Sequence, residues 1–370
     1  MVFKGTKNYR LRQIAESLES VGGYLNAFTS KEQTCFYARI LDQYLERAIS
    51  VLSDLVQHPL FSPTELKKEK QVVLEELKNL EDDPDDLIHD YFDRAVFGSH
   101  SLSFPVIGRA ETINSFNRES LLAHMHRHYV PRSMVVAAAG NIRHDKLVAM
   151  VQKYFGSMSN AGSRKGVAAR GPRHYRPKFE TVEKPIAQAH ICMGTIGYGV
   201  RNRFRYPLLV LNSVLGEGMS SRLFQNIREK YGFAYNVYSF VNMLTDTGNF
   251  GVYVGTDRNN VDKSVGLVHA ELEKLKSKPL KNNELTRAKS QLKGTMMLSL
   301  ESMPSRMMRL GSGELYLREY VPLDAVLNRI EAVHADHVLE TANDLFRLEK
   351  FSTVVFKPAD TSKLQTSNHV

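Results

Sequence analysis

The sequence predicts an α+β fold made of two duplicated halves, each a mainly antiparallel sheet covered by helices. Stretches with apolar side chains at every third or fourth position alternate with shorter apolar runs typical of strands. A second observation is an internal repeat. An offset of 219 residues places four residues of one helical pattern on four similar residues of another: Glu65, Leu66, Lys70 and Val73 on Glu284, Leu285, Lys289 and Leu292.

Length and composition suit two domains, since the chain has 370 residues, of which 42% are hydrophobic and 24% charged. The boundary is predicted at a stretch of small, polar and basic residues that contains no acidic side chain. We therefore expect a first half at 1–156, a basic linker at 157–178 and a second half at 179–370.

The first half contains a regular succession of helical and strand-like patterns. Its predicted helices are 11–20, 44–55, 63–80, 85–96 and 118–128, and its predicted strands are 24–29, 35–40 and 134–139. The second half is predicted to have strands at 187–194, 249–255 and 351–356 and helices at 206–215, 261–275 and 283–300.

The two halves differ at their beginnings. The strand at 187–194 and the helix at 206–215 have no counterpart in the first half. By this comparison the first half lacks roughly 30 to 45 residues of strand and helix.

The helix predicted at 63–80 carries two carboxylates in its apolar stripe. At ~100° per residue, Glu69 and Glu76 share one side with Leu66, Val72 and Leu80, so both are expected to point inward. A buried carboxylate is costly unless it is paired, hydrogen-bonded or bound to a metal, which makes the pair a candidate site. The alternative is one salt-bridged carboxylate and one at the edge of the stripe.

Paired glycines, Gly22 and Gly23, precede the strand 24–29. Such a pair permits a tight turn or a close backbone approach, and the following strand is a candidate sheet edge for pairing with an extended peptide. An ordinary hairpin with an unused edge is the alternative.

These segments, together with Phe3-Lys4-Gly5-Thr6 and with Arg228 and Tyr235 seven residues apart, resemble the pitrilysin-like zinc metallopeptidases. Within them, the chain is most similar to the branch that includes mitochondrial processing peptidase and its bacterial relatives. The resemblance runs over essentially the whole chain. It implies that the two halves face each other like a clamshell.

The resemblance also implies roles for individual residues. Glu76 matches the third zinc ligand and Glu69 a catalytic carboxylate behind it. Arg228 and Tyr235 match residues that orient substrate and donate hydrogen bonds near the developing oxyanion. The substrate is placed beside the β segment Asn26, Ala27 and Phe28. On spacing alone, Arg228 and Tyr235 also fit a solvated helix end and an ordinary strand.

One defining motif of that family does not occur in the sequence. Its members carry His-x-x-Glu-His on a helix just before the Phe-Lys-Gly-Thr segment, and here Met1 stands where the motif would just have ended. We therefore expect a chain truncated at its N-terminus, without the first strand and the zinc-motif helix. Zinc (Zn²⁺) binding should then be weak or absent.

Two functions are open at this point. One is a zinc-dependent metalloendopeptidase that cleaves extended peptides in a closed chamber and is inactive in this truncated form. The other is a non-catalytic subunit that binds peptides or supports a heteromeric peptidase. Both imply peptide substrates, and either a homodimer or a heterodimer with a related subunit. Retention of Glu69, Glu76, Arg228 and Tyr235 favours the enzyme.

Other classes of function are disfavoured. The net charge of +9 comes with no nucleic-acid motif, so a solvated basic hinge is the simpler account of the linker. No apolar run approaches the ~20 residues of a membrane span. Cys35 and Cys192 lie in apolar runs and are expected to be buried thiols, which suits a cytoplasmic location. His124 and His128 share a helix face, but Arg127 stands where a zinc motif would need glutamate.

Overall fold

The computed structural model describes residues 1–159, 171–172 and 175–359, and contacts between Cα atoms divide them into two units. The first unit comprises Met1–Lys78, the described part of Val106–Ala168, and Leu298–Tyr320. The second comprises Asn79–Pro105 and the described parts of Ala169–Met297 and Val321–Val370. Each unit thus includes a segment from the other half of the sequence.

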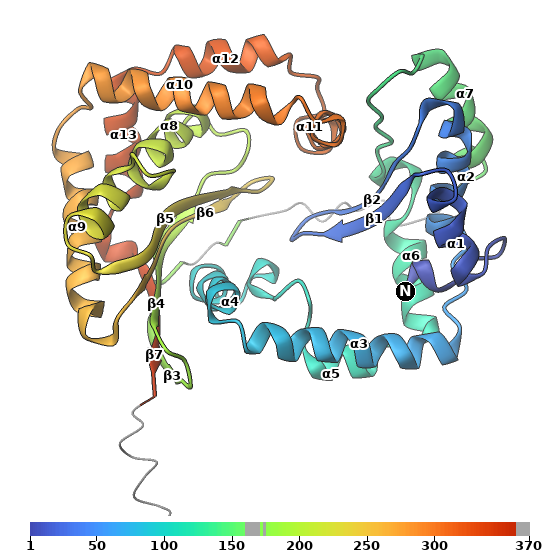
Figure 1. The fold of residues 1–370 in the computed structure, drawn as a ribbon, viewed down its shortest axis with the longest axis horizontal. Coiled ribbons are helices and arrows are strands. Elements are labelled where there is room, and N and C mark those ends of the chain that lie inside the picture. Colours follow the sequence, from blue (N-terminus) through green and yellow to red (C-terminus); the bar gives the residue numbers. More distant parts are fainter. Residues whose placement is uncertain (160–170, 173–174, 360–370) are drawn as a thin grey trace, which may run out of the picture. The chain divides into compact units, whose positions relative to one another are not determined.

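The first unit is built around a two-stranded antiparallel sheet (Figure 1). Helices α1 and α2 pack against each other and against this sheet, with Ile14, Val51 and Leu55 in the core. Its elements are α1 (Leu11–Glu19), β1 (Tyr24–Thr29), β2 (Thr34–Arg39), α2 (Leu45–Gln57), α3 (Pro63–Glu81, as far as Lys78), α5 (Ala110–Ser115), α6 (Arg118–His128), α7 (His144–Phe155) and α11 (Met303–Leu317).

Buried Asp54 holds the N-terminal segment against α2. Its carboxylate accepts hydrogen bonds from the hydroxyl of Thr6, from the side-chain amide of Asn8 at 2.7 Å and from the backbone N–H of Asn8 at 3.3 Å. His58 lies 3.1 Å away on the same helix. Because a buried carboxylate must be satisfied in this way, the segment around Lys4 has a fixed position beside α3.

The second unit contains a five-stranded sheet in the order β3-β7-β4-β6-β5, in which only β3 and β7 are parallel neighbours (Figure 1). The predicted mainly antiparallel sheet is therefore confirmed for this unit. Its elements are α4 (Pro84–Phe97), β3 (Phe179–Lys184), β4 (Ala189–Gly197), α8 (Arg205–Gly216), a π-helix (Phe224–Glu229), β5 (Ala234–Met243), β6 (Gly248–Thr256), α9 (Val261–Ser277), α10 (Asn282–Ser299, as far as Met297), α12 (Leu323–Glu331), α13 (Ala335–Leu345) and β7 (Ser352–Pro358).

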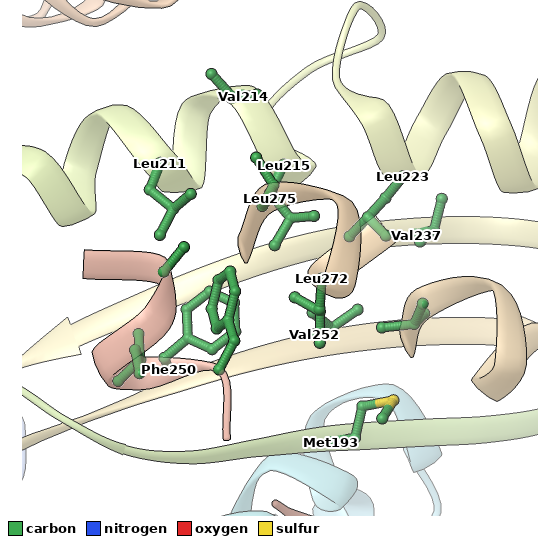
Figure 2. Packing of buried hydrophobic residues seen from close by; sticks show 14 of the residues in the cluster. Met193, Leu211, Val214, Leu215, Leu223, Val237, Phe250, Val252, Leu272 and Leu275 are labelled. Atoms are coloured by element: carbon green, nitrogen blue, oxygen red, sulfur yellow. The ribbon is translucent and has the colours of Figure 1, made fainter. Parts of the chain in front are cut away.

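Both faces of this sheet are covered. Met193, Phe250 and Val252 point to the side of α8, α9 and α13, where Leu211, Leu215, Leu272 and Leu275 meet them (Figure 2). The alternate residues, among them Cys192, Tyr253 and Phe356, form a second cluster with Ile88 and Phe92 of α4. The period of two along the strands thus produces two apolar layers.

The structure supports the internal duplication. Helices α3 and α10 begin 219 residues apart, and so do α4 and α11. On α10, Leu285, Ala288 and Leu292 are buried, and the equivalent α3 positions, Leu66, Glu69 and Val73, are among its partly covered residues. The exchange is reciprocal, because α4 belongs to the second unit and α11 to the first.

The strand predicted at Met134–Ala139 is wrong. The structure has no strand there, and Val135 and Val136 are exposed. In the second unit the equivalent segment is β7, which pairs with β3 and β4. A strand needs a hydrogen-bonded neighbour, and the described residues of the first unit contain no counterpart of β4.

The other predicted helices and strands are confirmed with shifts of a few residues at their ends. Cys192 is fully buried as expected, whereas Cys35 is only partly buried, with its Sγ 3.7 Å from Met308 Sδ. Most of the linker predicted at 157–178 lies outside the described residues. Within the described ranges, no helix is long and apolar enough to cross a bilayer.

A polar network lies among the aromatic rings between α4 and the sheet. Tyr253 donates to Asp85 Oδ1 at 2.7 Å, and His190 Nδ1 lies 2.8 Å from Tyr253 Oη and 2.7 Å from Asp85 Oδ1. His89 Nε2 is 2.9 Å from Tyr238 Oη. Burial lowers the pKa of both histidines. The negative charges of Asp85 and of neighbouring carboxylates raise the pKa, but by less.

This network predicts a dependence of stability on pH. A histidine whose pKa is lowered in the folded protein stabilises it fully above the unfolded value of about 6.5, and that stability is lost as pH falls toward the lowered pKa. Urea unfolding should therefore show a lower free energy of unfolding for the second unit at pH 5.5 than at pH 7.5. The double variant His89→Gln, His190→Gln should lose less on acidification, and exposed His144→Gln as much as the wild type. An equal loss in all three proteins would contradict the assignment.

The two units also differ in how many residues of their helices and strands are buried. All nine residues of β6 are buried, whereas β1, β2, α3 and α7 contain no buried residue. Amide hydrogens of β1, β2 and α3 should therefore exchange faster than those of β4, β6 and β7. Hydrogen exchange followed by mass spectrometry tests this, and equal or greater protection in the first set would overturn it.

Candidate functional site

Helix α3 carries Glu69 on its partly covered side. Its carboxylate pairs with Lys4 Nζ at 2.9 Å and with the amino group of Met1 at 3.4 Å. Partial burial raises the pKa of Glu69, but these two cations outweigh it and leave the pKa below its ordinary value. Glu69 is therefore an ionised, partly buried carboxylate at neutral pH, as expected for one member of the pair.

The second carboxylate does not point inward, so that expectation is wrong for Glu76. Its side chain is exposed, and Val72 on the same side of α3 is 49% exposed. Glu76 follows Glu69 by two turns, but it lies at the exposed edge of the stripe that Val73, Leu77 and Leu80 continue, which matches the alternative of one salt-bridged carboxylate and one at the edge. Thr295, its equivalent on α10, is exposed as well.

Strand β1 presents the substrate residues that the resemblance implied. Asn26 and Phe28 are exposed and Ala27 is partly covered. The Asn26 side chain accepts a hydrogen bond from the backbone of Ala27 at 2.8 Å and donates one to Tyr24 Oη. Among the described residues β1 pairs only with β2, so its other edge has free backbone groups.

The two glycines before β1 have the backbone role that their sequence suggests. Gly22 adopts a positive φ of 72°. A Cβ on Gly23 would lie 2.9 Å from the carbonyl oxygen of Leu18. The chain can therefore turn tightly out of α1 into the edge strand only with glycine at these positions.

Arg228 and Tyr235 of the second unit lie on irregular backbone. Arg228 belongs to the π-helix, is exposed, and holds its guanidinium 4.9 Å from the centre of the Phe224 ring. Tyr235 is 76% exposed and is the extra residue of a β-bulge, since Ala234 pairs with Thr256 and Asn236 with Gly255. Gly232, with φ of 64°, donates its N–H to the carbonyl of Arg228 at 2.9 Å.

These irregularities were not predicted from the sequence. A bulge redirects a side chain, and π-helical turns occur frequently at functional sites. The one signal in the sequence was the succession Ala234-Tyr235-Asn236-Val237, where two exposed residues stand between two buried ones and interrupt the alternation.

The residues present do not form a complete zinc site. Nowhere in the described ranges do three or more His, Cys, Asp or Glu side chains gather as metal ligands. Glu76 is an exposed carboxylate of α3, and the 370-residue sequence contains no His-x-x-Glu-His. The His124 and His128 rings lie 4.6 Å apart, but two ligands do not make a stable site.

Comparison with known proteins decides the family. Residues 1–110 match the model of the insulinase family, peptidase family M16, and residues 115–292 match the peptidase M16 inactive domain. The zinc protease YmxG of Bacillus subtilis is 43% identical over 359 residues, which cover 97% of this chain and 87% of that protein. This chain belongs to peptidase family M16. The pitrilysin-like resemblance is thereby confirmed.

Other M16 relatives agree. A zinc protease of Streptomyces coelicolor is 37% identical over 93% of this chain and 76% of its own length. Two solved structures share the fold at low identity. A protease from Helicobacter pylori has a TM-score of 0.89 at 22% identity, covering 96% of this chain and 87% of that one. The peptidase M16 inactive domain from Pseudomonas fluorescens has a TM-score of 0.86 at 19% identity, covering 97% and 87%. The predicted α+β two-domain fold is thus confirmed.

The incomplete ligand set leads to a prediction for the 370-residue chain. It should retain no stoichiometric zinc after dialysis and should not cleave an unstructured peptide, because a stable catalytic site needs three protein ligands. Metal analysis and a fluorogenic peptide assay test this. One zinc per chain together with cleavage that a chelator abolishes would refute it.

Proposed function

We propose that this M16 chain provides the substrate-binding surfaces and acidic residues of a metalloendopeptidase for extended peptides. The observation that carries the proposal is the backbone around Arg228 and Tyr235. A π-helix and a β-bulge both interrupt regular hydrogen bonding, and here they present two exposed side chains that pack into no core. Such irregularity is expected where side-chain direction serves binding rather than stability.

The edge of β1 supplies the second part of the proposal. An extended peptide can add to a free strand edge through main-chain hydrogen bonds, which depend little on peptide sequence. Asn26, Ala27 and Phe28 would then lie along the bound peptide. The chain's guanidinium and phenol donors, Arg228 and Tyr235, suit a peptide carbonyl that gains negative charge during cleavage.

Zinc chemistry requires more than these residues. In the proposal Glu76 is one metal ligand and Glu69 the carboxylate that supports the site, and the two histidines and the general base must come from a His-x-x-Glu-His helix. The relatives above are named zinc proteases. Reading the DNA upstream of the Met1 codon distinguishes the two functions: an in-frame motif supports the peptidase, and its absence supports a non-catalytic subunit.

We predict that two substitutions fail in different ways once such a helix is joined ahead of Met1. Glu76→Gln removes a metal ligand, so zinc content after dialysis should fall together with activity. Arg228→Ala removes a donor to the substrate, so zinc content should stay intact while kcat/KM falls by ~10²–10³. Zinc analysis and peptide cleavage on the same preparations give both readouts.

Matched controls are available for both variants. Glu75 is exposed and pairs with Lys78 on the neighbouring turn, so Glu75→Gln should change neither zinc content nor rate. Exposed Arg347, paired with Asp344, provides the control Arg347→Ala. Loss of zinc on Arg228→Ala, or full activity without its guanidinium, would show that the second unit is scaffold only.

A further inference from the structure

A polar cavity in the second unit stands apart from the residues discussed so far. Its volume is about 400 Å³. It lies where the loop after α8 meets the start of the π-helical segment and the first turns of α10. All the residues that line it have polar side chains, two are cationic and none is acidic: Ser220, Ser221, Arg222, Gln225, Asn226 and Arg287.

The charge at this cavity is positive. Arg222 is held by Glu284, whose two carboxylate oxygens accept from Nε and Nη2 at 2.7 and 2.8 Å. Arg287 is exposed and donates to the carbonyl of Ser220 at 3.3 Å. Glu284 pairs directly with Arg222 and also interacts with the charge of Arg287, so one carboxylate faces two guanidinium groups.

One buried hydroxyl of a residue that lines the cavity has no hydrogen-bond partner among the described residues. Ser221 is 1% exposed, and its Oγ makes no hydrogen bond within the part of the chain that the structure describes. A buried hydroxyl without a partner is unfavourable, and in native proteins it calls for an explanation. Gln225, in contrast, is engaged, since its amide donates to the carbonyl of Met219 at 2.8 Å.

We propose that this cavity binds an oxyanion, a carboxylate or a phosphate group. Guanidinium and hydroxyl groups together are the usual donors to such ligands, and an arginine fixed by a carboxylate presents its remaining N–H groups in a defined direction. A metal ion would find no acidic ligand in the lining. The site is independent of the peptidase proposal, because its lining includes neither Arg228 nor Tyr235.

The test uses the 370-residue chain and isothermal titration calorimetry at constant ionic strength. Inorganic phosphate is one probe, and a short acetylated peptide with a free C-terminal carboxylate is the other, with its amide as control. Saturable binding of either probe supports the proposal, and the arm that binds identifies the source of the oxyanion. Absence of saturable binding in both arms overturns it.

Substitutions locate the site. Arg287→Gln should weaken binding about tenfold or more, because it removes a cationic donor to a charged ligand. The matched control is Lys281→Gln, a cation near Glu284 that does not line the cavity. It should change affinity less than about twofold, since its charge is screened by solvent. If it weakens binding as much as Arg287→Gln, the anion is held by diffuse charge and the site is wrong. Circular dichroism melting confirms that each variant is folded.

Discussion

The packing of α4 against the sheet of the second unit is the contact on which the arrangement of this chain depends. A five-stranded sheet with helices on one side only would leave Cys192, Tyr253 and Phe356 open to water. Helix α4 closes that face with Phe92, whose ring meets Phe240 edge-on at 5.7 Å. Burying this second layer is strongly favourable, and the buried polar groups inside it are satisfied by Asp85, His89 and Asp93 of the same helix.

The regular core supports the irregular segments that matter for function. Strand β6 is buried along its whole length and pairs with β4 on one side and β5 on the other. Because this strand is fixed by two neighbours and two apolar layers, a bulge at Tyr235 can be tolerated at the edge of the sheet. The irregular backbone of the π-helix is tolerated as well, because Ile227 packs in the core.

The sequence predicted well those parts in which local pattern and packing agree. Helix α6 begins at Arg118 and ends at His128, and β1 begins at Tyr24 and ends at Thr29, as the periodicity indicates. Helix α11 was not predicted, because Gly311 and Gly313 interrupt its pattern and none of its residues is buried. The run Met134–Ala139 has the composition of a strand, but pairing is a property of the neighbours and not of the run.

The candidate site shows the same division. Glu69 was found because helical spacing fixes its direction, and Glu76 was misjudged because spacing does not tell which residues at the edge of an apolar stripe are covered. The cavity beside Arg287 was not predicted, since its lining comes from two segments about 65 residues apart, Ser220–Asn226 and α10. Side chains that meet only through the tertiary fold leave no short-range signal.

The reciprocal exchange of α4 and α11 makes each unit a product of both halves of the gene. A polypeptide cut between its two sequential halves would yield one fragment that lacks α11 of the first unit and another that lacks α4 of the second. The second fragment could not complete the apolar layer that α4 closes, so it would have to recruit the first. Duplication followed by such an exchange makes the second copy depend on the first in evolution, because loss of the first copy would expose the face of the sheet that α4 covers.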